Sequence, residues 1–217
     1  MADQRTNMVD SQVRPSDITD RRIIRAMGEV PRELFAPQQL RSIAYMDNAL
    51  RPLPATGLRP LSEPRLFAKL LQLAEIRDGG RVLEIGCGLG YGVAVLTAMG
   101  CTAIGLEETP ELAAQAQRAL EASGYGAAKI RSGPLPAGTM TDGPFDAILL
   151  SGSVAGIPPA LLDQLKSGAR LVAVVSHGPA GKATFWLRTG TTFDAREAFD
   201  AAAAPLPGFA RPRGFVL

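Results

Sequence analysis

The chain has 217 residues, of which 46% are hydrophobic and 20% are charged, and its formal net charge is +2. This composition suits one globular unit with a sizeable core and a small appendage. No window approaches the roughly 18 apolar residues of a membrane span, and residues 1–16 lack the apolar core of a signal peptide, so we expect a cytoplasmic protein with no membrane partner. The low charge and the lack of a basic stripe with interleaved aromatics exclude a nucleic-acid surface.

Few side chains are available for acid–base or metal chemistry. Cys87 and Cys101 have no metal-ligand spacing, which predicts reduced thiols and no bound metal. The single histidine, His177, follows an apolar run and is expected to be an ordinary loop residue. Ser153 lacks the flanking glycines of a G-x-S-x-G elbow, so a Ser-His-Asp hydrolase is not predicted.

The N-terminal part is read as a helical appendage. Residues 1 to about 16 are polar and lack periodicity, so we expect them to be disordered or loosely held. Asp17 or Asp20 is expected to cap a helix that ends at Pro31, followed by a short helical piece over 31–37 and a proline-broken loop up to Pro60. Ser62 is a candidate N-cap for a further helix, whose apolar face is Leu66, Phe67, Leu70, Leu71 and Ala74.

From Arg81 onward strands and helices alternate, which predicts an α/β fold with a doubly wound, mostly parallel sheet. The expected elements are strand 81–85, helix 91–99, strand 102–107, helix 110–123, strand 127–132, strand 145–150, helix 158–166 and strand 170–176. A strand over 183–188 and a later one ending at Phe199 or Phe215 are expected to form an antiparallel hairpin at the sheet edge.

The most informative segment is the apolar strand with Glu84 that runs into glycines at alternate positions, Gly86, Gly88, Gly90 and Gly92. Glycine at every second position costs conformational entropy, so the backbone there is expected to approach a ligand closely. A strand that turns into a helix N-terminus is a common place for a nucleotide-like ligand. The dinucleotide fingerprint needs glycine where Tyr91 stands, whereas E-x-G-x-G-x-G is the spacing of methyltransferases that use S-adenosylmethionine.

The next expected strand ends in Glu107, roughly 20 residues past the glycines, where a βαβ unit delivers an acid to a ribose. A carboxylate accepts hydrogen bonds from two hydroxyls at once. Glu108 competes for this role, and the alternative for Glu107 is an ordinary solvated strand end.

Nearly the whole chain resembles the protein-L-isoaspartate O-methyltransferase family. The matching segments are 26–35 (AMGEVPRELF), 44–45, 61–64 (LSEP), 82–91, 144–148 (PFDAI), 157–158 and 164–166. The resemblance implies a Rossmann-like methyltransferase fold and a cytoplasmic, usually monomeric enzyme. Such an enzyme would pass the methyl group of S-adenosylmethionine to the carboxylate of isoaspartyl residues in damaged proteins. Residues 1–77 would form a helical extension with the substrate lip, and 78–217 the cofactor-binding domain, packed as one unit.

By this resemblance Ser62 is the active-site serine, between the methyl donor and the incoming carboxylate. The candidate cofactor contacts are Leu61, Glu84, Gly86, Cys87, Gly88, Gly90, Glu107, Glu108, Ser132, Gly133, Leu135 and Ser151. No general base is needed, because the acceptor carboxylate is already ionised at neutral pH and positioning carries most of the catalysis.

The chain departs from the family pattern at two places. Pro134 replaces the aspartate expected to meet the adenine amino group, and Arg59 and Pro60 replace the glutamine and threonine before the serine. Arg59 and Arg65 are candidates to pair with a carboxylate substrate, with solvated arginines as the favoured interpretation. Two alternatives stay open: a methyltransferase for a different carboxylate acceptor, and a cofactor-binding relative without repair activity.

Overall fold

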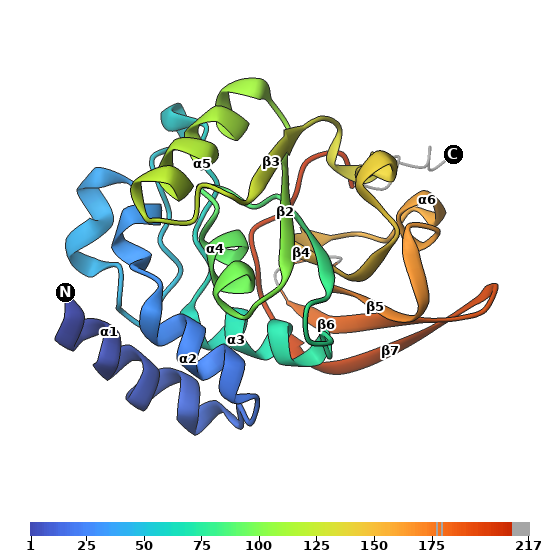
Figure 1. The fold of residues 1–217 in the computed structure, drawn as a ribbon, viewed down its shortest axis with the longest axis horizontal. Coiled ribbons are helices and arrows are strands. Elements are labelled where there is room, and N and C mark those ends of the chain that lie inside the picture. The colour runs from blue at the N-terminus through green and yellow to red at the C-terminus, as the bar shows by residue number, and fades with distance from the viewer. Residues whose placement is uncertain (177, 179, 210–217) are drawn as a thin grey trace.

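The computed structural model describes residues 1–176, 178 and 180–209 (Figure 1). Its centre is a seven-stranded sheet in the order β3-β2-β1-β4-β5-β6-β7. The strands are β1 Arg81–Ile85, β2 Thr102–Glu107, β3 Lys129–Ser132, β4 Phe145–Val154, β5 Leu165–Ser176, β6 Gly181–Thr189 and β7 Thr192–Ala201. Strands β1 to β5 pair in parallel, and the hairpin β6–β7 adds two antiparallel strands. The predicted mixed sheet is therefore confirmed; the alternative strand end at Phe215 lies outside the described residues.

The helices cover both faces of the sheet. They are α1 Ala2–Met8, α2 Arg21–Glu29, α3 Pro64–Leu73, α4 Tyr91–Ala98, α5 Pro110–Ala122 and α6 Pro159–Leu162. One core cluster joins the inner sides of α2, α3 and α4 to Val82 and Ala147, and the other joins α6 to Leu83 and Ile85. Figure 1 shows α6 on the opposite side of the sheet from α1–α5. Because strand residues alternate between faces, Glu84 points to the same side as Val82, toward α4.

The N-terminal segment is ordered, so the expectation of disorder over residues 1 to 16 was wrong. α1 continues into a π-helical turn, Val9–Val13, and a 3-10 turn, Arg14–Ser16. Met8, Val9 and Val13 are buried in the same core cluster as α2 and α3. These few apolar side chains gain a partner surface only in the folded protein, which is why local periodicity did not reveal the helix.

Cap geometry defines where helices α2 and α3 begin. Asp20 caps α2, since its carboxylate accepts a hydrogen bond from the Arg22 amide at 2.8 Å. Helix α3 begins at Pro64 with Glu63 at the N-cap position, so Ser62 is not its cap, and that prediction was wrong. None of the helices in the described part of the chain is both long and apolar enough to cross a membrane.

The link between β4 and β5 also differs from expectation. The helix predicted over 158–166 is only α6, and β5 begins at Leu165, which pairs with Phe145. A register shift follows before Ala147 pairs with Arg170. Lys166 Nζ lies 2.6 Å from Asp146 Oδ2. Lys166, predicted to end a helix, therefore binds the start of β5 to β4.

Candidate active site

The glycine turn lies at the carboxyl end of β1, where the strand order reverses between β1 and β4. Open α/β sheets bind ligands at this switch point. Gly86, Gly88 and Gly90 have φ values of 71°, 58° and 92°, in the left-handed region that side chains other than glycine rarely adopt. A Cβ on Gly88 would meet only Arg59 Cβ, at 3.8 Å, whereas one on Gly90 would lie 3.3 Å from Leu120. Gly88 therefore faces the site, and Gly90 packs against α5.

Glu84 is buried, and it projects from β1 against the first turn of α4. The Ser151 hydroxyl, at the end of β4, donates to Glu84 Oε1. The other oxygen, Oε2, is buried without a hydrogen-bond partner among the described residues. Burial raises the pKa of the Glu84 carboxyl to about 7, and the neighbouring charge of Glu107 acts in the same direction. A buried carboxylate with one free oxygen suits a cationic ligand.

Glu107 is fully buried at the end of β2, and it faces the glycine turn. Its Oε1 accepts from the Gly88 amide at 2.7 Å, and its Oε2 from the Glu108 amide at 3.0 Å. The Glu108 side chain is 47% exposed. Of the two competing acids, Glu107 is therefore the one bonded to the glycine turn.

Arg59 occupies the remaining side of Glu107. Its Nε lies 2.8 Å from Oε1 and 2.9 Å from Oε2, and its side chain is only 11% exposed. The expectation of a solvated arginine was wrong for this residue, because the ion pair joins positions 48 apart in the chain. Arg65 does match that expectation, with a 55% exposed side chain.

The opposite wall of the site is a lip formed by residues 59–62. Leu61 is fixed to Leu50 by two backbone hydrogen bonds of 2.9 and 3.0 Å. The carbonyl of Ser62 accepts from Arg32 Nη2 at 2.5 Å, and Arg32 Nε donates to the Ala44 carbonyl at 2.8 Å. Arg32 thus fastens the segment that carries Ser62.

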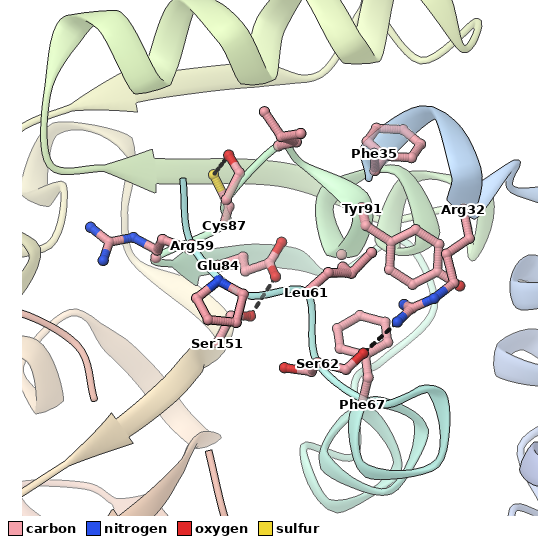
Figure 2. Close-up of a pocket in the computed structure, with 15 residues that line it drawn as sticks. Arg32, Phe35, Arg59, Leu61, Ser62, Phe67, Glu84, Cys87, Tyr91 and Ser151 are labelled. Carbon is pink, nitrogen blue, oxygen red and sulfur yellow. Dashed lines mark hydrogen bonds between the residues drawn. The ribbon is translucent and has the colours of Figure 1, made fainter. Parts of the chain in front are cut away.

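An aromatic cluster supports Arg32 from behind. The Arg32 guanidinium lies 4.8 Å from the centre of the Tyr91 ring, which also packs on Phe35 and Phe67 at centroid distances of 5.9 and 5.5 Å. Figure 2 shows these rings on the Ser62 side of the cavity, with the Arg59 guanidinium pointing away from Ser62. Sequence reasoning did not select these residues for the site. The signal that could have identified two of them is the family match over residues 26–35, which contains Arg32 and Phe35.

The space between these walls is small. The cavity measures about 20 Å³ and is lined by residues of the lip, the glycine turn, Glu84, Ser151 and the aromatic cluster. That volume holds about one water molecule. Leu206, whose amide donates to the Ser153 carbonyl at 2.8 Å, covers the turn, since a Cβ on Gly86 would lie 2.6 Å from its side chain. The carboxylates of Glu84 and Glu107 are negatively charged hydrogen-bond acceptors, so they suit a cationic group and the hydroxyl donors of a diol.

The predicted cofactor contacts do not all reach this cavity. Leu61, Glu84, Gly86, Cys87, Gly88 and Ser151 line it together with Ser62. Ser132 pairs with Glu107 across β3 and β2, and the Gly133 amide donates to the Glu107 carbonyl at 2.9 Å. Leu135 is buried in the second core cluster. These three residues lie outside the cavity lining, and so do Gly90, Glu107 and Glu108; Glu107 reaches the glycine turn through the Gly88 amide.

The thiols of the two cysteines are free and buried. Burial raises the pKa of the Cys87 thiol well above its usual range, and that of Cys101 to about 11, which disfavours the reactive thiolate. The residues that the structure describes hold no cluster of three or more candidate metal ligands. His177 lies outside them.

Comparisons with known proteins point to one family. The family model for protein-L-isoaspartate(D-aspartate) O-methyltransferase matches residues 3–188. A protein-L-isoaspartate O-methyltransferase 2 from an Anaeromyxobacter species is 40% identical over 179 residues, which cover 82% of this chain and 72% of that one. A protein-L-isoaspartate O-methyltransferase from Gloeobacter violaceus is also 40% identical, over 77% of this chain and 80% of its own.

Solved structures show the same fold. A protein-L-isoaspartate O-methyltransferase structure superposes with a TM-score of 0.82 at 22% identity, over 96% of this chain and 66% of that chain. A putative enzyme of this type from Plasmodium falciparum, in complex with S-adenosyl-L-homocysteine, gives a TM-score of 0.78 at 19% identity, over 93% and 97%. Given the extent of the family match and the identity to its members, the chain belongs to the protein-L-isoaspartate(D-aspartate) O-methyltransferase family.

Proposed function

We propose that this chain transfers the methyl group of S-adenosylmethionine to the carboxylate of isoaspartyl residues in damaged proteins, at the cavity between the glycine turn and the lip. The observation that carries the proposal is that Glu84 and the Gly86–Gly88 turn line one cavity with Ser62, while Glu107 accepts from the Gly88 amide just outside it. Family membership supports the same reaction. The cofactor, when bound, supplies a methyl group activated by a sulfonium centre.

Each wall has a distinct role in this proposal. Glu107 accepts hydrogen bonds from the ribose hydroxyls, because a carboxylate is a bidentate acceptor. The free Oε2 of Glu84 faces the cationic end of the cofactor. Ser132 and Gly133 adjoin Glu107 at the end of β3, and with Leu135 they would hold the adenine. Pro134 offers no carboxylate there, so backbone groups and apolar contact hold the base.

The lip orients the acceptor. Ser62 lines the cavity, and its backbone is held by Arg32, which leaves the hydroxyl to hydrogen-bond the incoming carboxylate. Orientation of two reactants is the larger part of catalysis for an acceptor that is already ionised. Ser62 has no capping role in α3, so the competing structural account of this serine is weakened. We further propose a cytoplasmic monomer that does not act on nucleic acid.

The test is methyl transfer from labelled S-adenosylmethionine to an isoaspartyl peptide and to its normal aspartyl twin. We expect methylation of the isoaspartyl peptide alone. Ser62→Ala should lower kcat more than it changes the affinity for the cofactor. Ser42→Ala, at an exposed serine outside the cavity, is the matched control.

Two results would contradict the proposal. If the wild type methylates neither peptide but accepts another carboxylate, the acceptor has been misassigned. If Ser62→Ala retains full activity, Ser62 does not orient the acceptor.

A further inference from the structure

The acceptor sites of Glu107 are fully used inside the protein. Its two oxygens receive the amides of Gly88 and Glu108 and, between them, Arg59 Nε at 2.8 and 2.9 Å. A carboxylate has about four lone-pair sites, and three protein N–H groups make four contacts with them, because the Nε–H of Arg59 is shared between both oxygens. Ribose hydroxyls therefore have no free acceptor on Glu107 while Arg59 stays in place.

The ion pair is internal, not a surface contact. The Glu107 side chain is fully buried, and that of Arg59 is 11% exposed. Solvent and salt weaken such a pair much less than an exposed one, and removal of one partner leaves the other charge buried and unpaired. Arg59 Nη2 is itself buried without a hydrogen-bond partner among the described residues, with Glu108 Oε2 at 3.6 Å. The guanidinium is thus only partly satisfied in its present position.

The backbone on one side of Arg59 is bonded to distant parts of the chain, and on the other side residues 53–58 are hydrogen-bonded within their own turn, with the Gly57 amide 3.1 Å from the Pro54 carbonyl. The Leu50–Leu61 bridge and the Arg32 bond to Ser62 hold the lip after Pro60. On the other side, Gly57 has a left-handed φ of 66° and no atom within 4 Å of where its Cβ would stand. The Arg59 side chain can therefore leave Glu107 while Ser62 keeps its place.

We propose that Arg59 is an internal occupant of the ribose site, so that S-adenosylmethionine binds only after the Arg59–Glu107 pair opens. This inference rests on the proposed function, because it concerns the same cofactor. Cofactor affinity then depends on the difference in free energy between two charge-assisted interactions of Glu107, one with the guanidinium and one with the ribose diol. Arg59 is a positioning residue, because it acts through Glu107: without the cofactor, its guanidinium pairs with the Glu107 carboxylate.

The test is calorimetric titration of S-adenosylhomocysteine into the wild type, Arg59→Gln and Arg65→Gln. Arg59→Gln removes the competing charge, so we expect its dissociation constant to fall by about 10- to 100-fold, the range of one charge-assisted hydrogen bond. Arg65→Gln makes the same charge change on the exposed first turn of α3, outside the lip, and should bind like the wild type. Without ligand, Arg59→Gln should also melt at a lower temperature than Arg65→Gln, because Glu107 is left unpaired.

Equal or weaker binding by Arg59→Gln overturns the inference, because Arg59 would then be a bystander or a cofactor ligand. Arg59→Met keeps the aliphatic stem and gives the same test if the glutamine variant fails to fold. Methyl transfer by the wild type together with equal affinities would leave the proposed function standing and remove only the role of Arg59. Absence of both binding and methylation in every variant would contradict both.

Discussion

Gly92 is a helix position where alanine should destabilise the protein, against the usual rule. It is the second residue of α4, and glycine inside a helix normally costs about 0.5–1 kcal/mol relative to alanine. Here a Cβ would lie 2.2 Å from Glu84 Oε1 and 2.5 Å from its Cδ and Oε2. The carboxylate would have to move away from Ser151, although it is buried.

The magnitude follows from two costs and one gain. A buried polar group that loses its partner costs about 1–3 kcal/mol, and an overpacked core costs about 1–3 kcal/mol more. After subtracting the gain in helix propensity, we expect Gly92→Ala to lower the free energy of unfolding by about 1–5 kcal/mol. For a chain of this size, each kcal/mol lowers the melting temperature by about 2–4 °C.

Urea unfolding and thermal melts followed by circular dichroism measure this effect. Gly28→Ala in α2 is the matched control, since its Cβ would make only an ordinary contact, 3.9 Å from Val9 Cγ2. It should stabilise the protein by about 0.5–1 kcal/mol. The reasoning is refuted if Gly92→Ala is as stable as the wild type, or if it costs as much when Glu84 is also alanine.

Two further predictions concern ionisation and the adenine side. Because burial raises the pKa of Glu84 from 4.5 to about 7, the folded protein holds a proton that the unfolded chain releases between these values. The stabilisation of the folded state by this proton is present in full below pH 4.5 and is lost as the pH rises through 7. Glutamine stays neutral, so the stability of Glu84→Gln relative to the wild type should grow by about 3 kcal/mol across this window and then level off. Urea unfolding from pH 4.5 to 8 checks this, and a pH-independent difference would contradict it. Pro134→Asp should restore a partner for the adenine amino group and tighten the binding of S-adenosylhomocysteine by about 0.5–1.5 kcal/mol in calorimetry. Pro134→Asn is the control, because asparagine has the shape of aspartate without its charge.

The sequence by itself determined the central βαβ unit. The strand 81–85, the glycine turn, the helix and Glu107 are close in the chain, and their conformations follow from glycine stereochemistry and apolar periodicity over short distances. The cap of α2 at Asp20 is local in the same sense. For this reason the family, the strand–turn–helix unit and the buried Glu107 beside the turn could be predicted from residues alone.

Tertiary structure decided whatever depends on partners far apart in the sequence. Met8 and Val13 form helical turns because α2 and α3 supply a surface for them, and Ser62 is excluded as a cap by the start of α3 at Pro64. The pairing of Arg59 with Glu107 is the clearest case. An arginine in a proline-broken loop has no local signal for burial, and only the folded sheet brings a buried carboxylate within its reach. The sequence therefore identified the glycine turn and Glu107, and the fold placed Arg59 against that carboxylate.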